Sequence, residues 1–417
     1  MLKRVAITGI GTINPLGRNV NDFFRSLDAG VSGATEITRF DCSLFKTRFA
    51  CEVPGYNPND FADIIDKKEA RKTDYYVHFA LIAAAEAMKD SCLDLDSIDR
   101  RRAGVVVGSG VGGINTLEDE LMGYTVGKEP RFSPFLIPKF ILNMASGHIA
   151  IKYGFQGPNF GVSSACATSA HAITTACNEI MLGRADIMVS GGAESPIGVP
   201  ALGGFNSAHA LSTRNDDFKR ASRPYDKTRD GFVIGEGSAI LILEEYEHAV
   251  RRGAKIYAEI VGAGMTCDAY HITAPLPDGE MAAYAMHLAM AQAGISEKDV
   301  DYINTHGTST VLGDIAELHA IKSVFGDHAY KLNISSTKSM TGHLLGAAGA
   351  IETLACIHAL RDGIIPPTIN FTEEDENIDY RLNLTLNQAQ KRTVRYAMNN
   401  NFGFGGQNAS LILKKVD

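Results

Sequence analysis

Short apolar runs bounded by glycine alternate along this chain with alanine-rich stretches that have the spacing of helices. The apolar runs predict strands at Val5–Ile10, Ala103–Val107, Asp186–Val189, Ser238–Glu244 and Ala258–Val261. The alanine-rich stretches predict helices at Tyr75–Lys89, Ala170–Leu182, Met281–Ala293 and Ala347–Leu360. Strands that alternate with helices indicate a layered α/β architecture.

Two pairs of similar segments suggest that the chain contains an internal duplication. Ile7-Thr-Gly-Ile-Gly11 resembles Ile260-Val-Gly-Ala-Gly264, and Ser163-Ser-Ala-Cys166 resembles Ser335-Ser-Thr-Lys338. The two pairs have different separations along the chain, so the first half is expected to hold insertions. A helix predicted over Glu244–Arg252 precedes the boundary, which divides the chain into halves at residues 1–253 and 254–417.

Composition narrows the possible classes of protein. The chain has 417 residues, of which 45% are apolar and 21% are charged. It can therefore bury a large core, and its composition is not that of an intrinsically disordered protein. It has no apolar run of membrane-spanning length, and it opens on a strand pattern, so we expect a cytoplasmic protein. Seven cysteines without a CxxC pair favour reduced thiols over a zinc site or disulfides. A net charge of −8 argues against nucleic-acid binding.

The candidate chemistry lies in three turns rich in glycine, serine and threonine. They contain Cys166, His306 and the pair Lys338 and His343. A thiolate can accept an acyl group from a thioester, and neutral imidazoles can donate hydrogen bonds to an oxygen that becomes negative. The set therefore predicts an acyl-transfer enzyme. Papain-like hydrolysis fits the residue types but not the paired histidines, and one thiol with two histidines is weak evidence for a metal site.

Cys166 falls at a predicted strand-to-helix junction. Unpaired N–H groups and the helix dipole there favour the thiolate, so we expect a lowered pKa and half of an oxyanion hole. Glu352 lies on the last long helix, where it can pair with Lys338 and cancel a buried charge. The remaining cysteines are expected to be small buried hydrophobes: Cys42, Cys51, Cys92, Cys177, Cys267 and Cys356.

Two glycine-rich segments have different interpretations. Gly108–Gly113 fits the dinucleotide pattern G-x-G-x-x-G, but it begins a hundred residues into the chain and no ribose-binding acid follows at the usual distance. We therefore do not expect NAD binding. The segment Phe402–Asn408 lies between two strand-like runs, and an aromatic residue on flexible glycines suits a gate or a close approach of the backbone.

At these residues the chain resembles the elongating, two-histidine β-ketoacyl-acyl-carrier-protein synthases, and most of all their synthase II branch. The resemblance covers essentially the whole chain. The motifs that carry it are Ser164-Ala-Cys-Ala-Thr-Ser169, Leu211-Ser-Thr-Arg-Asn215, Arg223-Pro-Tyr-Asp226, Arg229-Asp-Gly-Phe232, His306-Gly-Thr-Ser-Thr310, Ser336-Thr-Lys-Ser-Met-Thr-Gly-His343 and Gly403-Phe-Gly-Gly406. It implies the thiolase fold, in which two similar α/β halves pack as five αβαβα layers, and a homodimer.

The resemblance also implies catalytic roles. Cys166 takes the acyl chain from acyl carrier protein, and after malonyl carrier protein loses carbon dioxide, His306 and His343 stabilise the enolate. Lys338, paired with Glu352, keeps the two histidines in order. The N–H groups of Cys166 and Phe404 form the oxyanion hole. No cofactor is implied, because the phosphopantetheine arm arrives on the carrier, and no metal is implied.

Further residues match substrate-binding positions of the family. Thr308 and Thr310 match contacts to the pantetheine arm, and Val111 matches a position that lines the acyl pocket. Phe404 and Asn408 match a gate that admits malonate after acylation, and Phe402 opens the same segment.

The implied reaction extends fatty acyl chains by two carbons. An initiating synthase would have asparagine for one histidine, a chain-length-factor subunit would lack the cysteine, and a degradative thiolase would carry a second catalytic cysteine. Two alternatives stay open. One is a ketosynthase of a type II polyketide-like pathway. The other is a non-condensing subunit that binds the carrier protein.

The acidic carrier protein needs a basic surface on this acidic chain. A predicted helix start offers one, formed by Lys67, Lys68, Arg71 and Lys72. His209 is a departure, because the synthase II pattern has arginine there, and we expect weaker or more pH-dependent docking.

Overall fold

The computed structural model describes residues 2–124 and 128–416. Its main sheet has ten strands in the order β10-β9-β13-β14-β8-β1-β7-β6-β4-β5. In chain order these strands are β1 Val5–Ile13, β4 Ala103–Gly108, β5 Asn159–Val162, β6 Ile187–Glu194, β7 Gly237–Glu245, β8 Ala258–Cys267, β9 Tyr302–Asn304, β10 Asn333–Ser335, β13 Tyr396–Gly403 and β14 Gln407–Lys414.

The two halves of this sheet have the same topology. Numbered along the chain, the five strands of each half lie in the order third, second, fourth, fifth and first. In each half the third, second and fourth strands run parallel, and the last two pairings are antiparallel. The halves join where β1 and β8 pair antiparallel over three residues. This repetition confirms the predicted pair of similar α/β halves.

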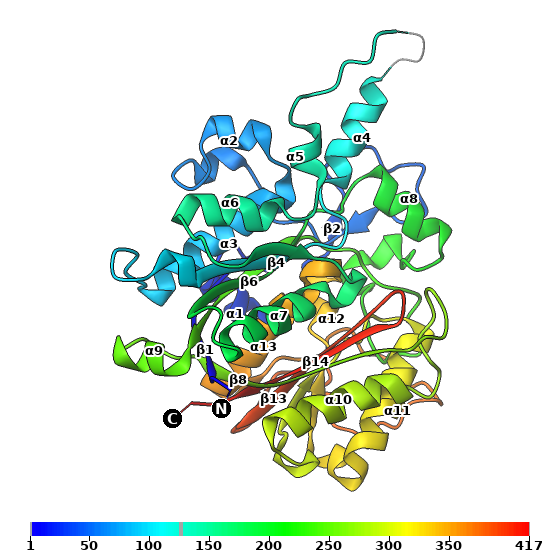
Figure 1. The fold of residues 1–417 in the computed structure, drawn as a ribbon. Coiled ribbons are helices and arrows are strands. Elements are labelled where there is room, and N and C mark those ends of the chain that lie inside the picture. Colours follow the sequence, from blue (N-terminus) through cyan, green and yellow to red (C-terminus); the bar gives the residue numbers. More distant parts are fainter. Residues whose placement is uncertain (1, 125–127, 417) are drawn as a thin grey trace.

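Helices complete five layers, as Figure 1 shows. Helices α3 (Tyr75–Ser91) and α6 (Met144–Tyr153) cover the outer face of the first half-sheet, and α7 (Thr168–Met181) and α13 (Ala348–Asp362) fill the middle. Helices α10 (Glu280–Ala293) and α11 (Val311–Phe325) cover the second half-sheet. Three large apolar clusters occupy the spaces between these layers, so the predicted αβαβα fold is confirmed.

The predicted elements are all present, most of them with longer bounds. The helix expected to begin at Glu244 instead begins after β7 has ended. Smaller elements are α1 Val20–Asp28, α2 Lys67–Lys72, α4 Ile114–Gly123, α5 Leu136–Phe140, α8 Val199–Ser207, α9 Tyr246–Arg251, α12 Lys338–Thr341, β2 Thr35–Glu36, β3 Phe49–Ala50, β11 Ile364–Ile365 and β12 Gln390–Lys391. Within the described ranges, no helix is long and apolar enough to cross a membrane.

The first pair of similar segments has a structural cause. A Cβ atom on Gly11 of β1 would lie 2.1 Å from the Ala83 carbonyl oxygen of α3. A Cβ atom on Gly264 of β8 would lie 1.9 Å from the Ala285 carbonyl oxygen of α10. Each half therefore uses glycine to let its outer helix cross its first strand at close range.

The second pair of similar segments does not align as the sequence suggested. A 3₁₀ turn precedes each central helix, and the turns share a left-handed residue, Ala165 at φ 49° and Leu345 at φ 47°. Gly346, not Lys338, therefore occupies the place that corresponds to Cys166. Lys338 lies on α12, in a segment that the first half does not have between its third strand and its central helix.

The expectation of buried structural cysteines is only partly right. Cys51, Cys177 and Cys356 are buried, and Cys42 is half-buried. Cys92 and Cys267 are exposed. Cys92 follows the last residue of α3 in a left-handed conformation, and Cys267 is the last residue of β8. Both therefore lie where a helix or strand ends at the surface.

Candidate active site

Cys166 lies in the 3₁₀ turn between β5 and α7, as the sequence predicts. The Thr168 hydroxyl accepts a hydrogen bond from the Ser164 N–H at 2.7 Å and donates one to the Ala165 carbonyl at 2.7 Å, which fixes the turn. The backbone of the β13–β14 hairpin packs against it. A Cβ atom on Gly403 would lie 2.9 Å from the Ser164 carbonyl oxygen and 3.1 Å from the Cys166 nitrogen, so a side chain here would push the two backbones apart.

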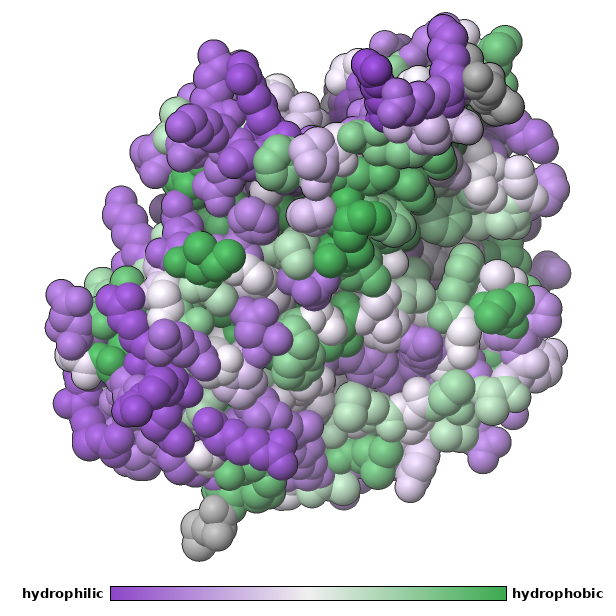
Figure 2. Space-filling model, turned by 45° about the horizontal axis from the view of Figure 1, so that its top comes forward, coloured by the Kyte–Doolittle hydropathy of each residue, from purple (hydrophilic) through white to green (hydrophobic). Residues whose placement is uncertain are grey.

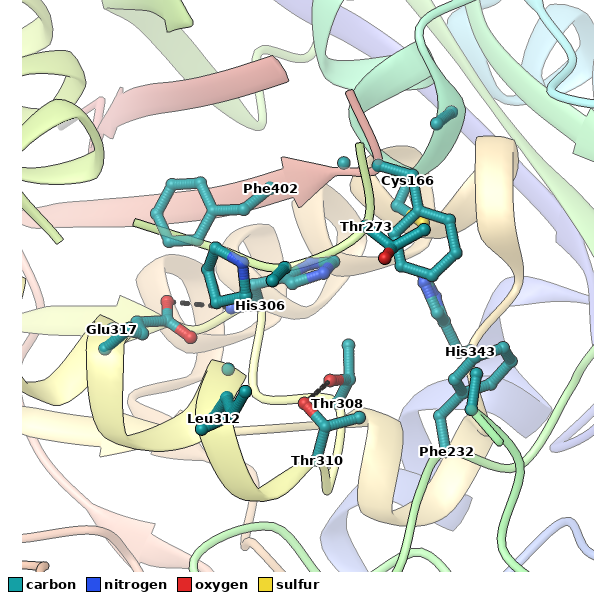
Figure 3. A pocket seen from close by; sticks show the side chains of 18 of the residues that line it. Cys166, Phe232, Thr273, His306, Thr308, Thr310, Leu312, Glu317, His343 and Phe402 are labelled. Atoms are coloured by element: carbon teal, nitrogen blue, oxygen red, sulfur yellow. Dashed lines mark hydrogen bonds between the residues drawn. The ribbon is translucent and has the colours of Figure 1, made fainter. Parts of the chain in front are cut away.

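The two histidines come from turns in the second half and face each other beside Cys166 (Figure 3). Their ring centroids are 5.4 Å apart, with an angle of 85° between the ring planes. The backbone N–H of His343 donates to the Val233 carbonyl at 2.7 Å, and its ring packs edge-on against Phe232. Both His343 ring nitrogens and Nδ1 of His306 are buried without a hydrogen-bond partner among the described residues. They are therefore available to a bound ligand.

Behind the histidines, Lys338 and Glu352 form the predicted ion pair. Both side chains are at most 2% exposed, and the Asn401 amide also donates to the Glu352 carboxylate. Neither residue lines the cavity. The pair therefore acts on the site through its field and its packing.

The pKa of the Cys166 thiol differs from the value that the sequence predicts. Burial raises the pKa of Cys166 to about 12, although the Lys338 ammonium and the Phe404 N–H oppose this shift. The predicted lowering of the thiol pKa is therefore wrong, because the apolar surroundings outweigh the helix terminus. Burial and the Lys338 charge hold the pKa values of His306 and His343 well below the usual range, so both imidazoles are neutral, as expected.

These pKa shifts predict a distinct pH response. Alkylation of Cys166 by iodoacetamide is expected to rise about tenfold per pH unit between about pH 7 and 9, because only the thiolate reacts. Peptide mapping after short pulses separates it from the exposed Cys92 and Cys267. A plateau below about pH 8 would show that the helix terminus controls the thiol after all.

A cavity of about 540 Å³ connects these groups. The Thr308 and Thr310 hydroxyls, 2.9 Å apart, lie on one wall, and the Asn408 amide donates to Asp268 at 2.6 Å. The Phe404 N–H is near enough to the Cys166 sulfur to lower the pKa of the thiol, and its role as an oxyanion-hole donor stays a prediction. All the predicted substrate residues line the cavity, namely Val111, Thr308, Thr310, Phe402, Phe404 and Asn408.

The sequence analysis did not identify two buried carboxylates of the site. Glu317 on α11 accepts the N–H groups of His306 at 2.9 Å and Gly307 at 2.8 Å, and burial raises its pKa to about 7. Glu194, at the end of β6, accepts four hydrogen bonds beside the cavity. Glu194 could have been noticed as a carboxylate at the end of an apolar strand, whereas Glu317 lies on a helix with other charged residues and gave no such signal.

The four basic residues expected to dock the carrier lie on α2, away from the cavity lining. Lys67, Lys68, Arg71 and Lys72 are all exposed, and none forms an ion pair within the described part of the chain. His209 is exposed too, but it lines the cavity.

Comparison with known proteins identifies the family. The model of the β-ketoacyl synthase N-terminal domain matches residues 2–249, and that of the C-terminal domain matches residues 257–372. The chain belongs to the β-ketoacyl synthase family. The division at residues 253 and 254 into two domains stays a prediction.

Curated relatives match over nearly the full length. A 3-oxoacyl-[acyl-carrier-protein] synthase 2 of Coxiella burnetii is 48% identical and covers 99% of each chain. One of Staphylococcus aureus is 47% identical and covers 100% of this chain and 99% of that protein. Among solved structures, a β-ketoacyl synthase of Burkholderia phymatum has a TM-score of 0.91 at 36% identity, with full coverage of both chains. A type II polyketide ketosynthase in complex with its acyl carrier protein has a TM-score of 0.91 at 35% identity, also with full coverage.

Proposed function

We propose that this synthase extends fatty acyl chains by decarboxylative condensation with malonyl-acyl carrier protein, as a 3-oxoacyl-[acyl-carrier-protein] synthase of type II. One observation carries the proposal. A helix-terminal cysteine lines the same cavity as two neutral histidines, three of whose ring nitrogens are buried without a partner among the described residues. These are the groups that thioester transfer and enolate formation need.

In the first half-reaction the Cys166 sulfur attacks the acyl thioester carbonyl. The N–H groups of Cys166 and Phe404 stabilise the oxyanion. The bond from the carbonyl carbon to the carrier sulfur breaks, and the thiol proton of Cys166 goes to the departing sulfur. The Lys338 charge favours the thiolate during this step, because it is the strongest opponent of the burial effect on the thiol pKa.

In the second half-reaction malonyl carrier protein occupies the emptied cavity. Loss of carbon dioxide leaves an enolate, whose oxygen accepts hydrogen bonds from His306 and His343. The enolate carbon then attacks the acyl carbonyl on Cys166, a carbon–carbon bond forms, and the Cys166 sulfur leaves. Because both imidazoles are neutral, they donate without giving up a full proton.

Product mass spectrometry tests this function. Purified protein is mixed with malonyl carrier protein and with acyl carrier proteins of increasing chain length, beside a Cys166→Ala variant. Products two carbons longer than each substrate, absent with the variant, are expected. Failure to acylate Cys166 with any chain would overturn the assignment.

A polyketide-type ketosynthase is the second candidate, since solved neighbours at 35% identity include such enzymes. The curated fatty-acid relatives are closer, at 46–48% identity. Acylation of Cys166 without extension of any straight chain would favour the polyketide reaction. A non-condensing carrier-binding subunit would show neither acylation nor extension.

Acyl carrier protein is the proposed partner, and α2 is its proposed docking element. A Lys68→Glu/Arg71→Glu variant is expected to raise the KM for carrier substrates about tenfold with little change in kcat, because exposed charges steer association. Steady-state kinetics at two salt concentrations measure this effect. The control is Lys298→Glu, at another exposed lysine. An equal rise in KM with the control variant would contradict the proposal that α2 docks the carrier protein.

A homodimer is the proposed assembly. The edge strand β5 is largely exposed, and Phe160 on it is 39% exposed. Met122 on α4 and Ile137 on α5 are 82% and 60% exposed. Figure 2 shows apolar surface between two hydrophilic prominences of the molecule. An open strand edge with apolar surroundings suits pairing with a second copy. A sedimentation-velocity experiment that shows only monomers would contradict the proposed homodimer.

No cofactor is part of the proposed reaction, because the phosphopantetheine arm arrives covalently on the substrate. We also place the reaction in the cytoplasm. All seven cysteines are unpaired, which suits a reducing compartment.

A further inference from the structure

Glu194 is a buried carboxylate to which the mechanism assigns no role. It lies at the end of β6 and is fully buried. One oxygen accepts from the Ser109 hydroxyl at 2.6 Å and from the Val111 N–H at 3.2 Å. The other accepts from the N–H groups of Gly110 at 2.7 Å and Gly346 at 2.8 Å. Such a carboxylate fixes the backbone groups that it binds, because any of them left unpaired would be costly.

The packing around this carboxylate excludes side chains. A Cβ atom on Gly110 would lie 2.7 Å from Oε2 of Glu194. A Cβ atom on Gly346 would lie 2.5 Å from the same oxygen and 2.4 Å from the Gly110 nitrogen. Glycine at both positions therefore lets two backbone segments, one from each half, converge on a single acid.

The same contacts explain the dinucleotide-like motif. The N–H groups of Gly110 and Val111 bind Glu194, that of Gly112 donates to the Ser109 hydroxyl, and that of Gly113 to the Phe140 carbonyl. These donors hold an internal acid and not a phosphate.

The position of Glu194 relative to α13 resembles that of the Cys166 sulfur relative to α7. Gly346 occupies the position in the second half that Cys166 occupies in the first. The start of α13 thus faces the Glu194 carboxylate, as the start of α7 faces the reactive sulfur.

The segment that Glu194 holds is also a wall of the catalytic cavity. Gly110 and Val111 line the cavity together with Cys166, whereas Glu194 lies behind them. A Cβ atom on Gly110 would lie only 3.7 Å from the Ala165 carbonyl oxygen, next to the nucleophile. The acid therefore sets the distance between this wall and the reacting cysteine.

We propose that Glu194 is a positioning residue for acyl-chain length. It holds the Gly110–Val111 wall against Gly346 and so keeps the cavity open for long acyl chains. This inference rests on the proposed function, since it assumes that acyl chains fill the cavity. Every acyl chain on Cys166 begins beside this wall, and a longer chain contacts it over more carbons, so displacement of the wall costs long chains more than short ones.

The test compares acylation of Cys166 across chain lengths in the full protein with Glu194→Gln. The amide keeps the size of the side chain, but in either orientation its NH₂ group confronts at least one backbone N–H donor. Acylation by long-chain carriers is expected to fall at least about tenfold relative to short-chain carriers. The matched control is Glu86→Gln on α3, where a carboxylate accepts the N–H groups of Thr12 and Val20 away from the cavity.

Each outcome decides one question. Glu86→Gln is expected to keep the wild-type chain-length profile. A wild-type profile in folded Glu194→Gln would overturn the inference, whereas wild-type protein that accepts no acyl chain would overturn the proposed function instead. If Glu194→Gln does not fold, Ser109→Ala removes one donor and keeps the carboxyl group of Glu194. It is expected to shift the profile in the same direction by about threefold, and an unchanged profile there would also overturn the inference.

Discussion

Replacing His343 with alanine is expected to slow decarboxylation of malonyl carrier protein by about 10²–10³-fold, because the enolate loses one of its two preorganised donors. Acylation of Cys166 should change by less than about threefold, since its oxyanion is held by backbone N–H groups. Carbon dioxide release and intact-protein mass measure the two steps separately. The neutral imidazole persists as pH falls through 6.5, because its pKa is lowered, so wild-type decarboxylation should stay level there.

His287→Ala is the matched control for this variant. His287 is exposed on α10 and does not line the cavity, so neither step should change. Equal losses in acylation and decarboxylation with His343→Ala would contradict the division of labour between backbone donors and histidines. They would indicate that His343 acts mainly by supporting the Phe232 side of the cavity.

Replacing Lys338 with methionine is expected to lower the free energy of unfolding by about 3–5 kcal/mol, because Glu352 would remain as an unpaired buried carboxylate. Both half-reactions should also slow. The Lys338 charge opposes the rise of the Cys166 pKa, so its loss makes the thiolate rarer. It also lowers the pKa of both histidines, so without it they become protonated at higher pH. Activity should then begin to decline at a higher pH than it does in the wild-type protein.

A double variant separates stability from catalysis. Lys338→Met/Glu352→Gln removes both charges with little change in volume, and chemical denaturation should show that most of the lost stability returns. Activity should stay low, because the ammonium is still missing. If the double variant is as unstable as Lys338→Met, the unpaired carboxylate is not the source of the loss.

Local features of the sequence determined much of this protein. The pattern of apolar and alanine-rich positions depends only on residues within one helix or strand. It therefore predicted the strands and helices with small errors at their ends. The junction at Cys166 and the crossing glycines of β1 and β8 are also local, because a backbone turn or a close helix approach restricts the residue at that position. The neutral histidines followed from the chemistry of acyl transfer, whereas the Lys338–Glu352 pair was suggested by charge balance and by the resemblance to the family.

Tertiary structure decided what depends on residues distant along the chain. Glu194 meets Gly346 across 152 positions, and no local pattern shows that Gly346, not Lys338, is the counterpart of Cys166. The thiol pKa was misjudged for the same reason. A helix terminus is visible in sequence, but the apolar walls that outweigh it come from both halves of the fold. The sequence determined which chemical groups are present. Only the packing of distant residues decided the electrostatic environment of these groups and the cavity around them.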